Sequence, residues 1–287
     1  MTPTQRSRVG IPALTNTAGM YGMLAVDQRE SLRAMMTAVE GGEVADAELS
    51  AFKIDATKAI SPMSTAVLLD RFYSREAADV AECPIVLAAD VLSQERGGPV
   101  TGSSVDTGIT AELARRFHAS ALKMLVQWEP RKREAAIELA ASFMELCRSC
   151  GLPGIVEGVV RPHDIAEWSQ DRRNDALITA ATDFASVSPN LYKAEVPSFG
   201  RGDEQAIITC AASITEAVPC DWVVLSSGVA PADFARAVTL CVAGGASGFL
   251  AGRAVWMDAL TSDNVHDYLW NESRPRFRSL LRAIGDA

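Results

Sequence analysis

Lys193 lies within Asn190–Pro197, a short apolar segment whose composition predicts a buried strand. Desolvation disfavours the ammonium form of lysine. A buried lysine can therefore have a pKa well below its ordinary value of about 10.4 and carry a neutral amine near pH 7. Such an amine can attack a carbonyl carbon. We therefore expect Lys193 to form a Schiff base with a ketone substrate.

Two further charged residues interrupt apolar segments. Lys123 lies in Ala121–Gln127 and Glu157 in Gly154–Val160. On strands close to Lys193, a cationic Lys123 would lower the pKa of Lys193 by repulsion, and Glu157 could exchange protons with the carbinolamine and the leaving hydroxyl. The alternative is a Lys–Glu cluster that only fills the interior. Because unpaired buried charges are costly and such interiors normally hold Val, Ile and Leu, the pattern favours function.

Asp27 ends the apolar run Tyr21–Asp27, as a residue at the rim of an active site would. The case for its function is weaker, because an acid at the end of a strand can also cap the next helix. The same alternative holds for Asp70 and Asp90.

The segments Leu225–Val229 and Gly248–Ala254 predict an anion site. They supply backbone amides that glycines leave accessible, and an arginine lies beside them. In eight-stranded α/β barrels the loops after the seventh and eighth strands are the recurrent phosphate position. The alternative, that the glycines only turn the chain, does not explain the arginine. The candidate phosphate ligands are Ser226, Ser227, Gly228, Gly252 and Arg253.

These segments belong to a regular series of elements. Eight unbroken apolar runs alternate with helical segments, which predicts a parallel sheet covered on both faces. At 287 residues, with no linker and no G-x-G-x-x-G after the first run, we expect one α/β domain over residues 1–287, a (β/α)8 TIM barrel. The expected strands are Tyr21–Asp27, Ala66–Asp70, Pro84–Asp90, Ala121–Gln127, Gly154–Val160, Asn190–Pro197, Asp221–Ser226 and Gly248–Arg253.

Ser93–Gly108, rich in Gly, Ser and Thr, is longer than a minimal connection and is a candidate lid. The pair Cys147 and Cys150 has the spacing C-x-x-C. It falls at the end of a predicted helix, whereas a reactive thiolate is favoured at a helix start. We therefore expect a structural role for these two thiols.

Composition excludes several classes of protein. With 27 Lys+Arg against 36 Asp+Glu, a formal charge of −9 gives no general attraction for nucleic acid or an anionic membrane. No apolar run approaches a membrane span or a signal peptide. Six scattered cysteines and three histidines fit free thiols and no zinc site. We expect a cytoplasmic protein without a metal.

Beyond these features, the sequence resembles the class I aldolases of the tagatose-1,6-bisphosphate aldolase family, and more closely the sulfofructose-phosphate aldolase branch of sulfoquinovose breakdown. The resemblance implies a TIM barrel, cofactor-free and metal-independent retro-aldol cleavage, and a Schiff base at Lys193. The matching motifs run the length of the chain: Met23–Glu30, Ala59–Pro62, Ala121–Val126, Val159–Pro162, Leu191–Pro197, Leu225–Val229 and Gly245–Trp256.

By the same resemblance, Glu157 is the general acid/base, and Asp27 and Lys123 orient substrate hydroxyls and tune the lysine. The serines and glycines of the anion site, with Arg253, would hold the phosphate of the dihydroxyacetone-phosphate half. The expected ligands of the sulfonate headgroup are Gln28, Arg29 and Ser61. Two places depart from the branch: Gly158, where a proline is common, and the segment His163–Arg173.

The expected function is cleavage of 6-deoxy-6-sulfofructose 1-phosphate to dihydroxyacetone phosphate and sulfolactaldehyde. One alternative keeps the chemistry and changes the substrate to tagatose or fructose 1,6-bisphosphate. An alternative of another class is a non-catalytic barrel that binds sugar phosphates. Because barrels of this acidity and apolar content commonly associate, we expect a homo-oligomer whose one partner is a small sugar phosphate.

Overall fold

A closed parallel barrel forms the centre of the protein. The structure is a computed structural model that describes residues 8–94, 100–164 and 168–285. Its barrel strands lie in the order β1-β10-β9-β8-β7-β6-β3-β2. The predicted (β/α)8 architecture is confirmed. The strands are β1 Tyr21–Ala25, β2 Ala66–Leu69, β3 Ile85–Ala88, β6 Ala119–Trp128, β7 Gly154–Val160, β8 Leu191–Glu195, β9 Asp221–Leu225 and β10 Gly248–Ala251.

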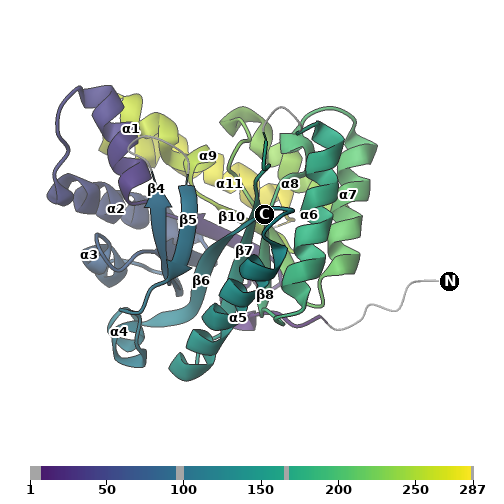
Figure 1. Ribbon diagram of the computed structural model, residues 1–287. Helices are drawn as coiled ribbons and strands as arrows, with labels where there is room; N and C mark the ends of the chain where they lie inside the picture. Colours follow the sequence, from purple (N-terminus) through teal and green to yellow (C-terminus); the bar gives the residue numbers. More distant parts are fainter. Residues whose placement is uncertain (1–7, 95–99, 165–167, 286–287) are drawn as a thin grey trace.

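Helices follow the barrel strands and lie on the outside of the barrel (Figure 1). None in the described part of the chain is long and apolar enough to cross a membrane. Their bounds are α1 Glu30–Glu40, α2 Asp46–Ile60, α3 Arg75–Asp79, α4 Ala111–Arg116, α5 Arg133–Cys150, α6 Gln170–Ala185, α7 Glu204–Ala217, α8 Phe234–Ala243, α9 Arg253–Trp256, α10 Val265–Tyr268 and α11 Arg274–Ala283.

Local sequence signals explain several helix ends. The side chains of Thr110, Ser169 and Asp203 each accept a hydrogen bond from a backbone N–H in the first turn of the helix that follows. Gly151 ends α5 in the left-handed conformation, with φ at 67°. These caps fix where the helices begin and end, and so set the lengths of the loops around the barrel.

Alternate residues of each strand face the barrel interior. The inner cluster contains Met23 and Ala25 of β1 but not Leu24, which packs in the layer between the barrel and the helices. The same alternation places Ala121, Ile155 and Leu191 inside. Because side chains alternate along a strand, residues two positions further along face the same interior.

A short N-terminal segment closes the amino end of the barrel. Ile11 and Leu14, around a 3-10 turn at Pro12–Leu14, belong to the inner apolar cluster. The Tyr21 hydroxyl accepts a hydrogen bond from the Ile11 N–H at 2.8 Å and lies 3.2 Å from Asp221 Oδ2. The barrel therefore has an apolar floor. We call the opposite end, where the carboxyl ends of the strands lie, the mouth.

The expected lid, Ser93–Gly108, is largely an antiparallel hairpin rather than a loop. β4 Asp90–Gln94 pairs with β5 Val100–Val105. This hairpin stands beside the barrel (Figure 1). Arg71 holds the base of the hairpin through two contacts to Asp106, at 2.5 and 3.1 Å. Residues 95–99, within the expected lid, lie outside the described residues.

Replacing Tyr21 with Phe should destabilise the protein. The change leaves the buried Ile11 N–H without its acceptor, which costs about 1–3 kcal/mol of unfolding free energy. Urea denaturation followed by circular dichroism measures this loss. Tyr268→Phe is the matched control, because among the described residues the hydroxyl of this half-buried tyrosine has one long contact, with Arg276 at 3.4 Å. Equal stability of Tyr21→Phe and the native protein would contradict this account of the floor.

Candidate active site

Four charged side chains face the barrel interior just above its apolar layer, on the side of the mouth. Each stands two residues after an inward apolar residue: Asp27 after Ala25, Lys123 after Ala121, Glu157 after Ile155 and Lys193 after Leu191. All four are buried, with exposures of 2–7%. Glu157 and Lys193 are partners in the register of β7 and β8. The structure thus brings together all four residues that the sequence predicted as catalytic.

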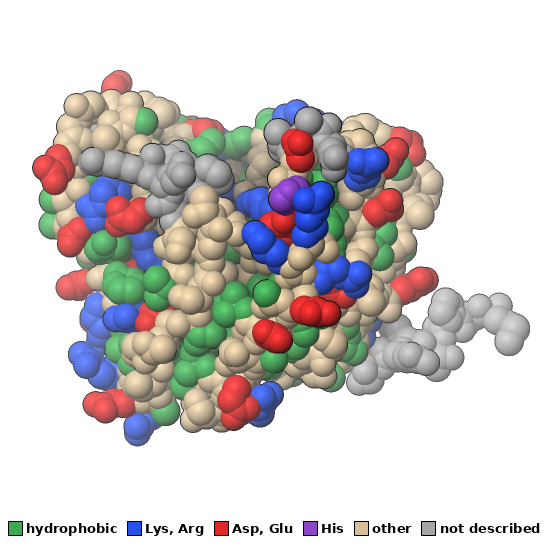
Figure 2. All heavy atoms as spheres, in the orientation of Figure 1, with side chains coloured by type: hydrophobic (Ala, Val, Ile, Leu, Met, Phe, Trp, Pro, Cys, Tyr) green, Lys and Arg blue, Asp and Glu red, His purple; other side chains and the backbone are tan. Residues whose placement is uncertain are grey.

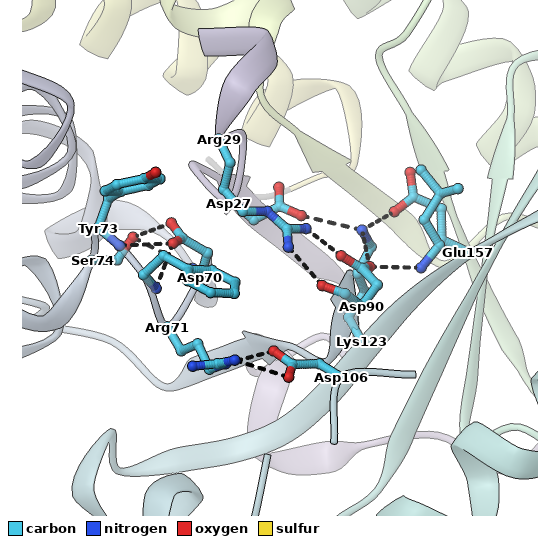
Figure 3. A network of polar contacts seen from close by, with 12 residues as sticks. Asp27, Arg29, Asp70, Arg71, Tyr73, Ser74, Asp90, Asp106, Lys123 and Glu157 are labelled. Carbon is cyan, nitrogen blue, oxygen red and sulfur yellow. Dashed lines mark hydrogen bonds and ion pairs between the residues drawn. The ribbon is translucent and has the colours of Figure 1, made fainter. Parts of the chain in front are cut away.

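Lys123 is the centre of this group (Figure 3). Its Nζ lies 2.7 Å from Glu157 Oε2, 3.1 Å from Asp27 Oδ2 and 3.4 Å from Asp90 Oδ2. The same Glu157 oxygen is 3.1 Å from Lys193 Nζ. One carboxylate oxygen therefore bridges the two lysines, which is the geometry needed to pass a proton between them and a bound reactant.

The two lysines differ in their electrostatic surroundings. Burial lowers the pKa of Lys193, and the charge of Lys123 lowers it further, although Glu157 and Asp27 act in the opposite direction. For Lys123, burial also favours the neutral amine, but the carboxylates Asp27, Asp90 and Glu157 outweigh it and raise the pKa. Lys123 is the permanent cation, and Lys193 is the amine that more readily becomes a nucleophile.

Asp27 stays ionised in this cluster. Burial works to raise its pKa, but the charges of Lys123, Lys193 and Arg29 outweigh burial and lower that pKa to about 2. A carboxylate at this position can accept hydrogen bonds from hydroxyl groups but cannot donate a proton at neutral pH. It suits the orientation of a sugar hydroxyl.

Asp90 is a further member of the cluster, although its place at the end of a strand suggested only a helix cap. It is fully buried, accepts a hydrogen bond from the Leu125 N–H at 2.9 Å, and pairs with both Lys123 and Arg29. The missed signal was its spacing, because Asp90 stands two residues after the inward-facing Ala88. The other four charged residues have the same spacing from an inward-facing residue.

A second buried ion pair supports the end of β1. Lys53, from α2, donates to the Val26 carbonyl at 2.6 Å and pairs with Asp70. Asp70 also accepts from the backbone of the loop after β2 and from the Ser74 hydroxyl, at 2.6–2.9 Å (Figure 3). This pair holds the residue directly before Asp27, so it helps to fix the position of the Asp27 carboxylate.

The predicted anion loops lie side by side at the mouth. The Gly252 N–H donates to Ser226 Oγ at 3.3 Å, and Arg253 donates to Ser227 Oγ at 2.6 Å. Gly228 is exposed and has a left-handed backbone, with φ at 80°. Ser226 is buried, whereas the Arg253 side chain is exposed. The five residues predicted for the phosphate are thus brought together.

The three residues predicted for the far headgroup lie in different places. Gln28 is beside Gly252, because a Cβ built on that glycine would lie 3.0 Å from Gln28 Nε2. Its Oε1 is buried without a hydrogen-bond partner among the described residues. Arg29 donates to the Asp90 carbonyl at 2.6 Å and pairs with the Asp90 carboxylate, so its guanidinium is already engaged.

Ser61 does not belong to this group, and its assignment to the headgroup is wrong. It follows α2 and precedes β2, which places it at the amino end of the barrel, opposite to the mouth. It is fully buried, and its hydroxyl accepts a hydrogen bond from the Glu82 N–H at 3.1 Å. Its role is to join the turn before β2 to the turn before β3.

Gly158 is explained by its neighbour on β8. A Cβ at this position would lie 2.3 Å from the Tyr192 hydroxyl and 3.0 Å from the Phe184 ring. The strand β7 continues through Gly158 to Val160 without interruption. The glycine therefore gives room to a tyrosine and leaves the position of Glu157 unchanged. Among the described residues, no group of three or more His, Cys, Asp or Glu could hold a metal ion.

A comparison with protein families agrees with the barrel and its cluster. The family model described as DeoC/LacD family aldolase matches residues 22–258. The chain belongs to the DeoC/LacD family of aldolases. It is an enzyme, an aldehyde-lyase of the class I type. The predicted resemblance is confirmed at this level, and the narrower resemblance to the sulfofructose-phosphate branch stays a prediction.

Individual relatives of this DeoC/LacD family aldolase are distant. Tagatose 1,6-diphosphate aldolase 1 of Enterococcus faecalis is 26% identical over 292 residues, which cover 90% of this chain and 86% of that protein. Tagatose 1,6-diphosphate aldolase of Listeria monocytogenes is 22% identical over 310 residues, covering 96% and 91%. Each match spans most of both chains.

Solved structures share the fold. A Schiff-base-forming fructose-1,6-bisphosphate aldolase superimposes with a TM-score of 0.63 at 16% identity, covering 94% of this chain and 96% of that one. The fructose-bisphosphate aldolase of Slackia heliotrinireducens gives 0.65 at 14% identity, covering 96% and 89%. These likenesses support the barrel architecture of the DeoC/LacD aldolase described here.

Replacing Lys123 with Met should raise the pKa of Lys193. The change removes the positive charge that repels the Lys193 ammonium, while the carboxylates of Glu157 and Asp27 remain to stabilise that ammonium. Reductive methylation of Lys193, followed by mass spectrometry across pH, should show its midpoint at a higher pH than in the native protein. The free energy of unfolding should fall by about 3–5 kcal/mol, because buried carboxylates lose their partner.

Lys58→Met is the control for this experiment, because Lys58 is an exposed residue of α2. It should change neither the midpoint nor the stability. A folded Lys123→Met variant whose Lys193 midpoint is unchanged or lower would contradict the division of roles between the two lysines.

Proposed function

We propose that Lys193 is the Schiff-base nucleophile of an aldolase that cleaves a ketohexose 1-phosphate carrying a second anionic group at C6. The observation that supports this most strongly is the Glu157 oxygen shared by two buried lysines, one held as a cation and one with a lowered pKa. A nucleophilic amine and a proton carrier are in contact, as covalent catalysis at a carbonyl requires.

The first half of the proposed reaction forms the iminium. The Lys193 amine attacks the C2 ketone, giving a carbinolamine. Glu157, beside Lys193 Nζ, carries protons to the hydroxyl that leaves as water. The product is a protonated imine between C2 and Nζ, and its positive charge lies next to Glu157 and Asp27, which stabilise it.

The second half breaks the carbon–carbon bond. A base removes the proton of the C4 hydroxyl, the C3–C4 bond breaks, and its electron pair moves into the iminium to give an enamine. The aldehyde fragment leaves. Protonation of C3 and addition of water to C2 then release dihydroxyacetone phosphate and return Lys193 as an amine. Asp27 is positioned to orient a substrate hydroxyl during these steps.

The phosphate at C1 is assigned to the anion loops at the ends of β9 and β10. The Ser227 and Arg253 side chains and the exposed backbone of Gly228 face the mouth there. A guanidinium with nearby hydroxyl and N–H donors suits a phosphate. The buried and unpartnered Gln28 Oε1, beside Gly252, is an acceptor for a substrate hydroxyl close to this phosphate.

For the group at C6 we propose the sulfonate of 6-deoxy-6-sulfofructose 1-phosphate, with sulfolactaldehyde as the second product. The support is the resemblance of motifs, together with the pairing of Arg29, the cation expected for this group, with the Asp90 carboxylate. A sulfonate carries one negative charge and a phosphate close to two at neutral pH. Tagatose or fructose 1,6-bisphosphate is the second candidate, supported by the names of the relatives.

Borohydride reduction in the presence of dihydroxyacetone phosphate should leave a stable adduct on Lys193. Reduction turns the imine into a secondary amine that peptide mass spectrometry locates. Lys193→Met should be folded, should give no adduct and should cleave no substrate above the background rate, while Lys58→Met should behave as the native enzyme. Full activity with an unmodified Lys193, or turnover by Lys193→Met, would require another nucleophile.

Competitive kinetics should separate the two candidate substrates. We expect kcat/KM for 6-deoxy-6-sulfofructose 1-phosphate to exceed that for tagatose and fructose 1,6-bisphosphate by at least about tenfold, the effect of about 1.4 kcal/mol in transition-state binding. The measurement supplies the substrates together and follows both aldehyde products. An equal or greater kcat/KM for a bisphosphate would instead assign that bisphosphate as the substrate.

A further inference from the structure

A second polar layer lies directly above Glu157 and Lys193. Glu195 stands two residues after Lys193 on β8, and Arg161 follows the end of β7, four residues after Glu157. The backbone of Arg161 still pairs with β6, through its N–H to the Trp128 carbonyl at 2.8 Å. The alternation of the strand therefore continues, and Arg161 lies on the same side as Glu157.

The charges of this layer do not balance. Glu195 is buried, accepts the Val160 N–H at 2.8 Å, and pairs with Arg173 of α6 at 3.2 Å. Arg161 comes only within 3.8 Å of the same carboxylate. One carboxylate thus faces two guanidinium groups, and Arg173, which is almost fully buried, already compensates it. Among the described residues, Arg161 therefore has no carboxylate closer than this shared one.

Arg161 is also the more accessible of these groups. Its side chain is 37% exposed, compared with 3% for Arg173 and 11% for Arg29. One of its nitrogens donates to the Val160 carbonyl at 2.8 Å. The other two have no hydrogen-bond partner in the part of the chain that the structure describes. Figure 2 shows Lys and Arg side chains near the upper ends of β7 and α6, with His and Asp or Glu side chains among them.

The strand order shows on which side of the proposed substrate Arg161 lies. The phosphate loops end β9 and β10, Lys193 lies on β8, and Arg161 follows β7, the next strand of the ring. A substrate with its C1 phosphate at β9 and β10 and its C2 on Lys193 extends C3 to C6 away from those strands. β1, which carries Gln28 and Arg29 after its end, lies on the other side, next to β10.

We propose that Arg161 binds the anionic group at C6 and so determines which aldehydes the enzyme accepts. This assignment rests on the proposed aldolase function and replaces Arg29 as the cation of the far headgroup. A guanidinium with two available nitrogens can bind two oxygens of a phosphate or a sulfonate. The chemistry common to both is a tetrahedral oxyanion at the end of the aldehyde fragment.

The test uses the reverse reaction, condensation, in which the aldehyde is a separate substrate and its binding can be measured on its own. Dihydroxyacetone phosphate is kept saturating, and three aldehydes are varied: sulfolactaldehyde, glyceraldehyde 3-phosphate and uncharged glyceraldehyde. In Arg161→Met the KM for the anionic aldehydes should rise about tenfold to a hundredfold, the loss expected for hydrogen bonds to a charged group. The KM for glyceraldehyde and that for dihydroxyacetone phosphate should stay within about twofold of native values.

Two further variants make the result specific. Arg131→Met removes an exposed arginine from the loop after β6, at the same end of the barrel, and should leave all KM values unchanged. Arg161→Lys keeps the charge and should recover part of the loss. Should Arg161→Met fail to fold, Arg161→Gln and Arg161→Lys carry the comparison. Whichever anionic aldehyde has the lower native KM identifies the oxyanion as sulfonate or phosphate.

An equal rise of KM for all three aldehydes, or none, would overturn the assignment of Arg161. Failure of the proposed function is recognised separately. Borohydride trapping by dihydroxyacetone phosphate alone requires Lys193 but not Arg161, so the adduct should form equally in native protein and Arg161→Met. If borohydride gives no adduct on Lys193 of the native protein, the proposed Schiff-base mechanism is wrong, whatever the aldehyde kinetics show.

Discussion

The contact of Lys123 with three carboxylates is the interaction on which the rest of the site depends. Asp27, Asp90 and Glu157 come from different parts of the ring, and each would be costly to bury alone. Their shared cation makes it possible for them to face the interior of one barrel. It also fixes Lys123 as the charged lysine, and that fixed charge is one reason why the neighbouring Lys193 loses its proton more easily.

The apolar floor has an equal part in this chemistry. Burial is the largest cause that lowers the pKa of Lys193, and burial at the centre of a barrel requires that water be excluded from below. Ile11 and Leu14 close the amino end, and the Tyr21 hydroxyl holds the Ile11 backbone. The apolar floor thus contributes to the burial that lowers the pKa of Lys193.

Most of the fold was predictable because a strand covered on both faces is mainly apolar, and every barrel strand here lies in a mainly apolar segment. Charged residues within those runs, such as Lys193, were predictable for the same reason. Partners were not. The sequence does not show that Asp90 engages Arg29, because the two are distant in the chain. Ser61 was misplaced because a motif match does not tell which end of a strand a residue occupies, whereas helix and strand order do.

The charges along the barrel axis change in a way that matches the proposed ligand. The floor is apolar, and the layer of Lys123 pairs its cations with carboxylates. At the mouth, two cations of the described part of the chain, Arg161 and Arg253, lack a close carboxylate of their own. A molecule with an anion at each end would balance both. The reacting carbon between those anions would then lie over Lys193, because β8 stands between the strands that carry the two arginines. In this arrangement the two ends of the substrate place C2 at Lys193, and the iminium formed there determines that the C3–C4 bond is the one that breaks.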